Sequence, residues 1–408
     1  MEKENMNLVI VGHIDHGKST LIGRLLFDTN SLPDGKIQEL KKTCKELGHN
    51  LEFAFVMDSL QEEVEQGMTI DTAQTFFKTS KRDYTIIDAP GHKEFVKNMI
   101  TGASQAETAI LIIDVNEGVK EQTKRHAYIL SMLGIKQLIV VLNKMDLVDY
   151  NEKKFNEVKT IISNFLDSLK IKPLYFIPIV AKDGDNVAKA SNKMKWYSGK
   201  TLLQGLDSFH VAESLTNRSL RLPVQDVYEI DGKPVLVGNI ESGKLKPGEE
   251  VMILPSNKAV KINSIESFLT DKKEAEAGES IGITLNQFIF VKRGDVICKK
   301  DDLAVVADRF SANILWMSNN KISVNEKIIL KLATQKTECI IEKIKQKIDS
   351  SSLELLEENA KELKEMEIGK VIIKTLKPVV IEKFNDVPGL GRFVLTQNSE
   401  ICAGGIIV

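Results

Sequence analysis

The sequence predicts three domains: a doubly wound α/β domain with a mostly parallel sheet, followed by two β-barrel domains. Over residues 1–210, short apolar runs alternate with longer amphipathic segments, which is typical of buried parallel strands joined by helices. After about residue 215, turn signals such as Asp231-Gly232, Ser242-Gly243 and Arg293-Gly294 separate short strands, as in antiparallel barrels. The apolar runs expected to form the sheet are 8–11, 84–87, 110–115, 138–142 and 175–180.

The change from alternating strands and helices to short strands separated by turns sets the expected domain boundaries. We expect an α/β domain over residues 1–212, a first barrel over 213–303 and a second barrel over 304–408. Within the last domain, residues 353–367 are highly charged and have a helical period. We therefore expect a solvated surface helix there, with a partner-binding helix as the alternative.

The composition is that of an ordinary globular protein, with 408 residues, a net charge of −2 and 27% charged residues. Because there is no overall basic field, the composition argues against DNA as a partner. The four cysteines are far apart and form no CxxC pair, which fits a reducing cytosol. The longest apolar stretches have only the length of strands, so we expect no membrane span and a cytoplasmic protein.

The segment Gly12–Thr20 reads GHIDHGKST and lies between the first apolar run and an amphipathic helix. A strand, a glycine-bracketed loop and a helix N-terminus form the setting of a phosphate-binding loop. Gly12 and Gly17 allow a sharp turn that aims backbone N–H groups at phosphate oxygens. Lys18 can reach the terminal phosphates, and the Ser19 hydroxyl can bind Mg²⁺.

Asp88-Ala89-Pro90-Gly91 follows the apolar run 84–87. An aspartate at this strand end can hold Mg²⁺ through water, and the Gly91 N–H can contact a γ-phosphate. Thr69 lies in the long segment between the first helix and this strand, where it can give Mg²⁺ a hydroxyl and sense the γ-phosphate. The segment around Thr69 is therefore predicted to be a switch loop.

Asn143-Lys144-Met145-Asp146 follows the apolar run 138–142 and predicts a guanine site. The Asp146 carboxylate can accept from two donors on the base edge, which adenine lacks. In this interpretation Asn143 bonds the other side of the base, and the Lys144 stem lies along the ring. Because the motifs follow the carboxyl ends of strands, where doubly wound sheets bind ligands, the sequence predicts a GTP/GDP site.

The motifs GHIDHGKST, GMTID, DAPGH and NKMDLVDY resemble those of the translation-factor GTPases, and the segments 220–227 and 388–393 resemble their second and third domains. The resemblance covers essentially the whole chain. It implies GTP hydrolysis with Mg²⁺, and it implies that His92 positions the attacking water. It also implies that Ile14 and Met68 gate His92, and that Asp15 helps to bind a monovalent cation.

The site residues expected on these grounds fall into three groups. Catalytic roles are expected for His92, Lys18, Thr69 and Asp15. Metal ligands are expected to be Ser19, Thr69 and Asp88. Nucleotide contacts are expected from Gly12, His13, Asp15, His16, Gly17, Lys18, Ser19, Thr20, Asp88, Gly91, Asn143, Lys144, Asp146, Ala181 and Lys182.

Two positions depart from the family pattern. Val64 stands where the family usually has arginine. The usual Ser-Ala guanine loop is Val180-Ala181-Lys182 here, so the Ala181 N–H can reach the guanine carbonyl but the serine hydroxyl is missing. We therefore expect nucleotide affinity to be lower than is usual in the family.

Two functions known in this family are the main candidates for this chain. We favour the regulatory GTPase subunit of sulfate adenylyltransferase, in a heterodimer with a catalytic subunit that makes adenylyl sulfate from ATP and sulfate. The segments 58–61 and 122–126, the pair Trp316-Met317 and the near-neutral charge favour it. The alternative is an elongation-factor-like carrier of aminoacyl-tRNA to the ribosome, which His16 favours, and a stand-alone regulatory GTPase is a third candidate.

Overall fold

The computed structural model describes residues 4–32, 74–87, 106–135, 137–210, 215–230, 232–266 and 272–408. The chain divides into two compact units, Met1–Ala212 and Glu213–Val408. The first unit contains a parallel sheet with helices, and the second contains only short helices and β-structure. The predicted fold class, an α/β domain followed by β-barrel structure, is confirmed.

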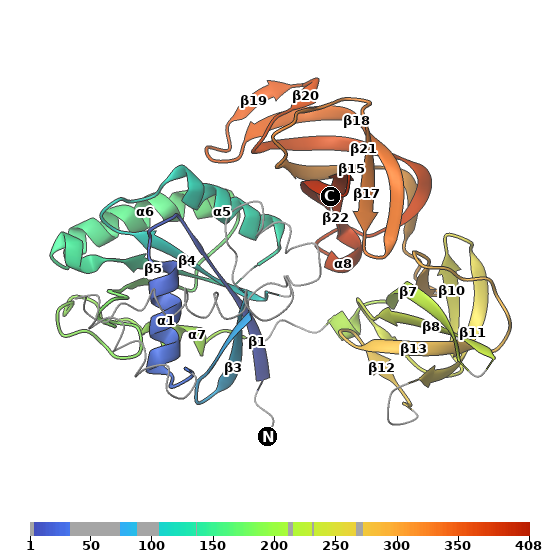
Figure 1. Cartoon of the computed structure of the whole chain (residues 1–408), viewed down its shortest axis with the longest axis horizontal. Helices are drawn as coiled ribbons and strands as arrows, with labels where there is room; N and C mark the ends of the chain where they lie inside the picture. The colour runs from blue at the N-terminus through green and yellow to red at the C-terminus, as the bar shows by residue number, and fades with distance from the viewer. Residues whose placement is uncertain are drawn as a thin grey trace. The chain divides into compact units, whose positions relative to one another are not determined.

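The first unit is built on a six-stranded sheet in the order β2-β3-β1-β4-β5-β6 (Figure 1). β2 is antiparallel to β3, and all other neighbours are parallel. The strands are β1 (Glu4–Gly12), β2 (Gln74–Lys78), β3 (Arg82–Ile87), β4 (Thr108–Asp114), β5 (Gln137–Asn143) and β6 (Tyr175–Pro178). Each predicted apolar run overlaps one of these strands, whereas the edge strand β2 was not predicted.

Helices cover both faces of this sheet, as the complete burial of β4 requires. They are α1 (Lys18–Asp28), α5 (Glu121–Met132), α6 (Glu152–Ser168) and α7 (Leu202–Leu206), with a short 3₁₀ helix, η1 (Met145–Val148). Leu21 and Leu25 of α1 share one core with Leu202 and Leu206 of α7 and with alternate strand residues. α5 and α6 lie together on the other face (Figure 1).

The second unit begins with a 3₁₀ helix, η2 (Leu215–Asn217), and a closed barrel in the strand order β10-β11-β13-β8-β7-β14. The barrel strands are β7 (Arg221–Ile230), β8 (Lys233–Asn239), β10 (Glu250–Leu254), β11 (Lys258–Glu266), β13 (Ser280–Leu285) and β14 (Val296–Lys299). A small two-stranded sheet joins β9 (Lys244–Leu245) to β12 (Ala275–Glu276). The alternating inward residues of these strands form one apolar core.

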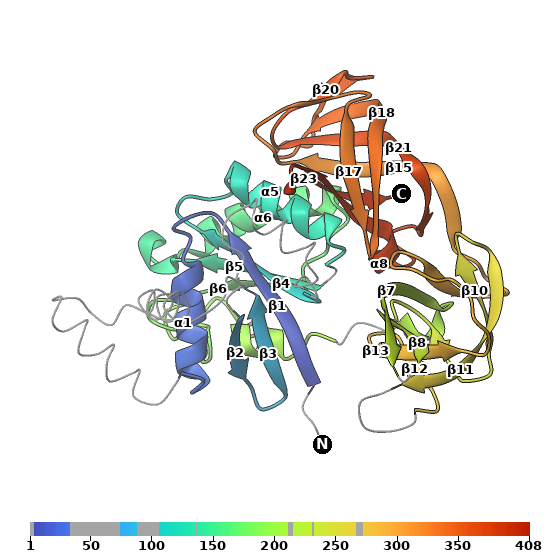
Figure 2. The same cartoon turned by 45° about the vertical axis from the view of Figure 1, so that its right-hand side comes forward.

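The rest of the second unit is a seven-stranded antiparallel sheet in the order β17-β22-β23-β15-β21-β18-β19 (Figure 2). Because β17 also pairs with β18, the pairings run round a closed ring. The strands are β15 (Val305–Trp316), β17 (Lys327–Leu332), β18 (Gln335–Asp349), β19 (Leu355–Glu358), β21 (Glu367–Ile381), β22 (Arg392–Gln397) and β23 (Glu400–Ile407). β16 (Ile322–Ser323) pairs with β20 (Glu362–Leu363), and α8 (Pro388–Gly391) precedes β22.

The helix expected over residues 353–367 does not form, so that prediction was wrong. The segment contains β19 and β20, and β19 extends the sheet by pairing with β18. Leu353 and Asn359 have φ angles of 62° and 53°, which interrupt a right-handed helix. The cross-strand ion pair between Lys347 Nζ and Glu357 Oε2, at 2.7 Å, satisfies a charge that the helical pattern assigned to solvent.

Candidate functional site

The loop between β1 and α1 turns on two glycines. Gly17 has a φ of 95°, in the left-handed region, and a Cβ there would lie 2.4 Å from Asn143 Nδ2. At Gly12 a Cβ would lie 2.4 Å from the carbonyl oxygen of Ile112 in β4. Both positions therefore exclude any side chain, which explains the two glycines that bracket the loop.

The helix that follows the loop presents the groups that a phosphate requires. Lys18 opens α1, and its Nζ donates to the carbonyl oxygens of Gly12 at 2.9 Å and His13 at 3.4 Å. The first N–H groups of an α-helix have no intrahelical acceptor and carry the positive end of the helix dipole. Ser19 is exposed in this first turn. The donors, the amine and the hydroxyl fit a phosphate group with a divalent cation.

His13 and His16 fasten the loop to its neighbours. His13 Nδ1 forms a hydrogen bond with Gln122 Oε1 at the start of α5. His16 is fully buried, and its Nδ1 donates to the carbonyl oxygen of Ile112 in β4 at 3.4 Å. Burial lowers the pKa of His16, although the Ile112 carbonyl opposes the shift, so the ring is neutral at pH 7. Both histidines therefore hold the loop in place.

Asn143, at the end of β5, connects the phosphate loop to the guanine loop. Its Nδ2 donates to the carbonyl oxygen of His16 at 2.9 Å, and its Oδ1 accepts from the N–H of Ala181 at 3.0 Å. The side chain is only 3% exposed. The Ala181 N–H was expected to contact the guanine carbonyl, but in the structure it donates to Asn143. The Asn143 amide therefore positions both loops.

Lys144 and Asp146 follow at the same end of β5. Lys144 has a φ of 61°, and its Nζ pairs with Asp114 Oδ2 at 2.9 Å. Asp114 ends β4 beside Asn143, and its Oδ1 accepts from the N–H of Asn116 at 2.8 Å. Asp146 lies partly exposed in η1. Asp114 therefore fixes the lysine stem, a role that sequence reasoning missed although an aspartate at a strand end was its signal.

The guanine loop itself is a tight turn after β6. Gly184 N–H donates to Val180 O at 2.8 Å, and Val180 N–H donates to Asp185 O at 3.2 Å. A Cβ at Gly184 would lie 2.5 Å from the guanidinium carbon of Arg24, so the turn packs directly on α1. Lys182 is exposed at its tip. Arg24 was not among the expected site residues, because nothing in its sequence setting marks it.

The structure thus brings together the expected residues of Gly12–Thr20, Asn143–Asp146 and Ala181-Lys182 at the carboxyl ends of β1, β5 and β6. The expected residues Thr69, Asp88, Gly91 and His92, and the gating residue Met68, lie outside the described residues. Among the residues that the structure does describe, no group of three His, Cys, Asp or Glu side chains is placed to hold a metal ion. Two of the three expected metal ligands are outside this part of the chain.

Family models account for nearly the whole chain. The model for the elongation factor Tu GTP binding domain matches residues 3–216. The chain belongs to the translation-factor GTPases. The models for elongation factor Tu domain 2 and for the GTP-eEF1A C-terminal domain match residues 234–298 and 309–408. Membership of this GTPase family makes the chain a GTP-binding protein and a GTP hydrolase.

Three relatives of this translation-factor GTPase, each matched over nearly its full length, are named elongation factor 1-alpha. The chain is 42% identical to elongation factor 1-alpha of Thermoplasma acidophilum, over 99% of this chain and 97% of that protein. It is 41% identical to elongation factor 1-alpha of Pyrococcus furiosus and 42% identical to that of Methanopyrus kandleri, each over 100% of this chain and 98% of the relative. A solved structure of sup35 with GDP aligns at 25% identity with a TM-score of 0.46.

These relatives overturn the sulfate adenylyltransferase interpretation, which was wrong. Of the residues that favoured it, the segment 58–61 lies outside the described part of the chain, and three others have structural roles. Gln122 holds His13 in the phosphate loop. Trp316 is 1% exposed and donates through Nε1 to Asn320 O at 2.7 Å, and Met317 is 3% exposed, so both are core residues. A near-neutral net charge does not report local charge, so it does not distinguish a protein partner from RNA.

A helix must be both long and apolar to cross a bilayer. In the part of the chain that the structure describes, no helix meets both requirements.

Proposed function

We propose that this chain is an elongation-factor GTPase that carries aminoacyl-tRNA to the ribosome in its GTP-bound state. The observation that supports the proposal most directly is the 42% identity, over 99% of the chain, to a protein named elongation factor 1-alpha. The net charge of −2 is compatible with this function, because tRNA binding needs local phosphate contacts rather than a basic chain. The function places the protein in the cytoplasm.

The phosphate half of the nucleotide site is assigned to the loop before α1. Lys18 would leave its loop carbonyls for the β- and γ-phosphates, and the N–H groups at the start of α1 would donate to phosphate oxygens. Bound Mg²⁺ would offset the negative charge of the phosphates, held by Ser19, Thr69 and Asp88. Further contacts are assigned to Gly12, His13, Asp15, His16, Gly17, Thr20 and Gly91, with a monovalent cation at Asp15.

The base half is assigned to the ends of β5 and β6. The Asp146 carboxylate would accept from two donors on guanine, and this requirement excludes adenine. Lys144, held by Asp114, would lie along the base, and Ala181 and Lys182 would close its far side. Asn143 would act by keeping the two loops at a fixed separation.

Hydrolysis is assigned to His92, which would orient the attacking water, with Thr69, Lys18 and Asp15 completing the catalytic set. The test is GTP turnover with and without ribosomes that carry mRNA and aminoacyl-tRNA. We expect ribosomes to stimulate the wild type, and we expect His92→Ala to bind GDP normally while hydrolysing GTP about 10²- to 10⁴-fold more slowly. The assignment would be contradicted if ribosomes did not stimulate GTP turnover, or if His92→Ala hydrolysed GTP at the wild-type rate.

A further inference from the structure

The segment of residues 186–197, here called the strap, follows the guanine loop in the chain and is fixed to the sheet. Asn186 is buried, and its Nδ2 donates to the carbonyl oxygen of Pro178 at the end of β6, at 2.9 Å. Its Oδ1 accepts from the N–H of Ser191 at 2.8 Å. Met194 is also buried. The strap therefore has a defined position beside the carboxyl end of β6.

Trp196 of the strap contacts the loop that follows β5. Its Nε1 donates to the carbonyl oxygen of Tyr150 at 2.8 Å, and its ring centre lies 5.2 Å from that of Phe155 in α6. Tyr150 follows η1, which contains Asp146, and its N–H donates to the carbonyl oxygen of Met145 at 2.8 Å. The strap is therefore joined to the loop that carries Asp146.

Lys193 of the strap joins this same loop to the guanine loop. Its Nζ lies 3.1 Å from Asp185 Oδ2, 3.5 Å from Asp183 Oδ2 and 5.2 Å from the centre of the Tyr150 ring. Two carboxylates in one turn repel each other, and a cation in contact with both offsets that repulsion. The amine of Lys193 therefore stabilises the guanine loop and connects it to the loop of Asp146.

The guanine loop depends on such contacts, because Val180 stands where the related GTPases usually have a serine. Backbone hydrogen bonds close the turn, and the Ala181 N–H in its first half donates to Asn143. The carboxylates that Lys193 contacts lie in the second half of the turn. With both halves held, the turn keeps one position for the base.

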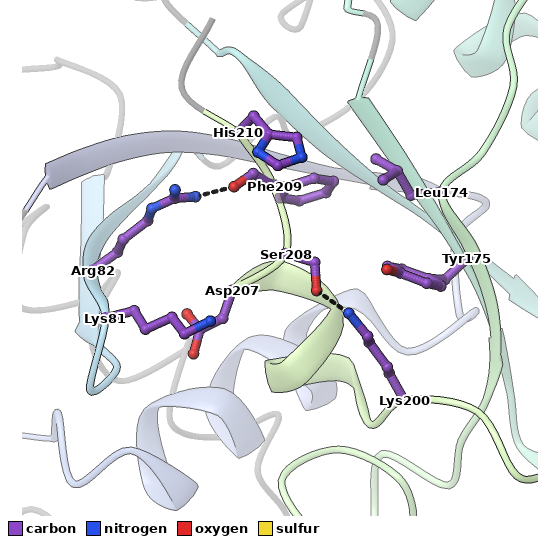
Figure 3. Close-up of a pocket in the computed structure, with 9 residues that line it drawn as sticks. All are labelled: Lys81, Arg82, Leu174, Tyr175, Lys200, Asp207, Ser208, Phe209 and His210. Atoms are coloured by element: carbon purple, nitrogen blue, oxygen red, sulfur yellow. Dashed lines mark hydrogen bonds between the residues drawn. The ribbon is translucent and has the colours of Figure 1, made fainter.

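A second lysine close in the sequence makes the same kinds of contact at the other edge of the sheet. Lys200 Nζ donates to Ser208 Oγ at 2.5 Å and lies 4.9 Å from the centre of the Tyr175 ring (Figure 3). Tyr175 opens β6, whereas the guanine loop follows the carboxyl end of this strand. Lys193 and Lys200 are both exposed. Lys200 is therefore a matched control for the loss of an amine in this part of the chain.

We propose that Lys193 is a positioning residue for the guanine base, which slows the release of guanine nucleotide by joining the two loops of the base half. The inference rests on the base half of the site proposed above. The observation that carries it is that one amine contacts Asp183 and Asp185 in one loop and Tyr150 in the other. Exposed ion pairs and cation–π contacts each contribute modestly, so a change of several-fold is expected rather than a loss of binding.

The test is the release of fluorescent GDP from the full chain with Mg²⁺, followed after addition of excess GDP. We expect Lys193→Gln to release it about three- to tenfold faster than the wild type. Lys193→Arg keeps the charge and the stacking on Tyr150, so its rate should stay within about twofold of the wild type. Lys200→Gln should leave the rate unchanged. Wild-type release from Lys193→Gln, or equal acceleration in Lys193→Arg or Lys200→Gln, would overturn the proposal.

Further variants separate the role of Lys193 from that of the base half itself. In a chain with Asp183→Asn and Asp185→Asn, Lys193→Gln should accelerate release less than in the wild type, because its ionic partners are gone. An equal acceleration in the two backgrounds would also overturn the proposal. Asp146→Asn tests the base half alone. Faster release from Asp146→Asn with wild-type release from Lys193→Gln would reject the role of Lys193 only, whereas wild-type release from both would reject the proposed base half as well.

Discussion

Asn143 lies buried at the end of β5 and uses both ends of its amide. Replacing it with alanine would leave the carbonyl of His16 and the N–H of Ala181 buried without their present partner. Each such group costs about 1–3 kcal/mol. We expect Asn143→Ala to lower the free energy of unfolding by about 3 kcal/mol and to weaken GDP binding at least about tenfold, as measured by denaturation and by fluorescent GDP.

The matched control for this prediction is Asn156→Ala, because Asn156 is exposed on α6. Its substitution should change stability by less than about 0.5 kcal/mol. If the two variants behave alike, Asn143 does not hold the loops together.

His16 makes stability depend on pH. Its pKa is lowered from 6.5, mainly by burial, so the unfolded chain takes up a proton in a range where the folded chain does not. The free energy of unfolding should therefore fall as the pH drops below about 6.5. We expect the fall in Tm between pH 7.5 and pH 5.5 to be smaller in His16→Gln than in the wild type. An equal fall in both would show that His16 does not resist protonation in the folded state.

At the residue scale, the sequence could predict the types of chemistry but not every partner. Lys18, Ser19 and Asp146 stand out because phosphate, Mg²⁺ and guanine demand those types at that spacing. The contacts of Asn143 depend on how far β5 and β6 extend, and the role of Gln122 depends on where α5 packs. Both are consequences of tertiary packing, which spacing along the chain does not record.

Among the elements, the turn from β1 into α1 has the strictest geometry. Gly17 combines a positive φ with a neighbour 2.4 Å from its missing Cβ, whereas Gly118 has a φ of 74° and no atom within 4 Å. Alanine at Gly118 should cost only the backbone strain, about 1–2 kcal/mol. We expect Gly17→Ala to lose at least tenfold more affinity for GDP than Gly118→Ala, measured by equilibrium binding. Comparable affinity in the two variants would show that the loop tolerates a side chain.

The strands were predictable where burial on both faces makes them continuously apolar, as in β4 and β5. The edge strand β2 and the pair β19 and β20 were not, because edge strands carry polar residues that share the composition of surface helices. In residues 353–367 the charge pattern matched a helix. The segment instead forms β19, which pairs with the edge of β18. A local sequence pattern contains no information about a strand edge, distant in the sequence, with which the segment can pair.

For the whole molecule, the sequence predicted the order of an α/β domain and β-barrel structure, and family models confirm that order. It did not separate two functions that share this fold. Among the signs used for sulfate activation, Trp316 and Met317 lie in the core and Gln122 contacts the phosphate loop, so they report the shared fold and not the function. Features that select a partner lie on surfaces, and surfaces leave weak patterns in a single sequence.

The central claim is that the GTP-bound chain carries aminoacyl-tRNA, and the lifetime of the aminoacyl ester tests it most directly. Bound carrier should shield the ester from water, so we expect slower hydrolysis when the chain is loaded with a non-hydrolysable GTP analogue. With GDP the ester should decay at the rate of free aminoacyl-tRNA, because the switch to the GTP state is absent. Identical decay with the GTP analogue, with GDP and without protein would contradict the account.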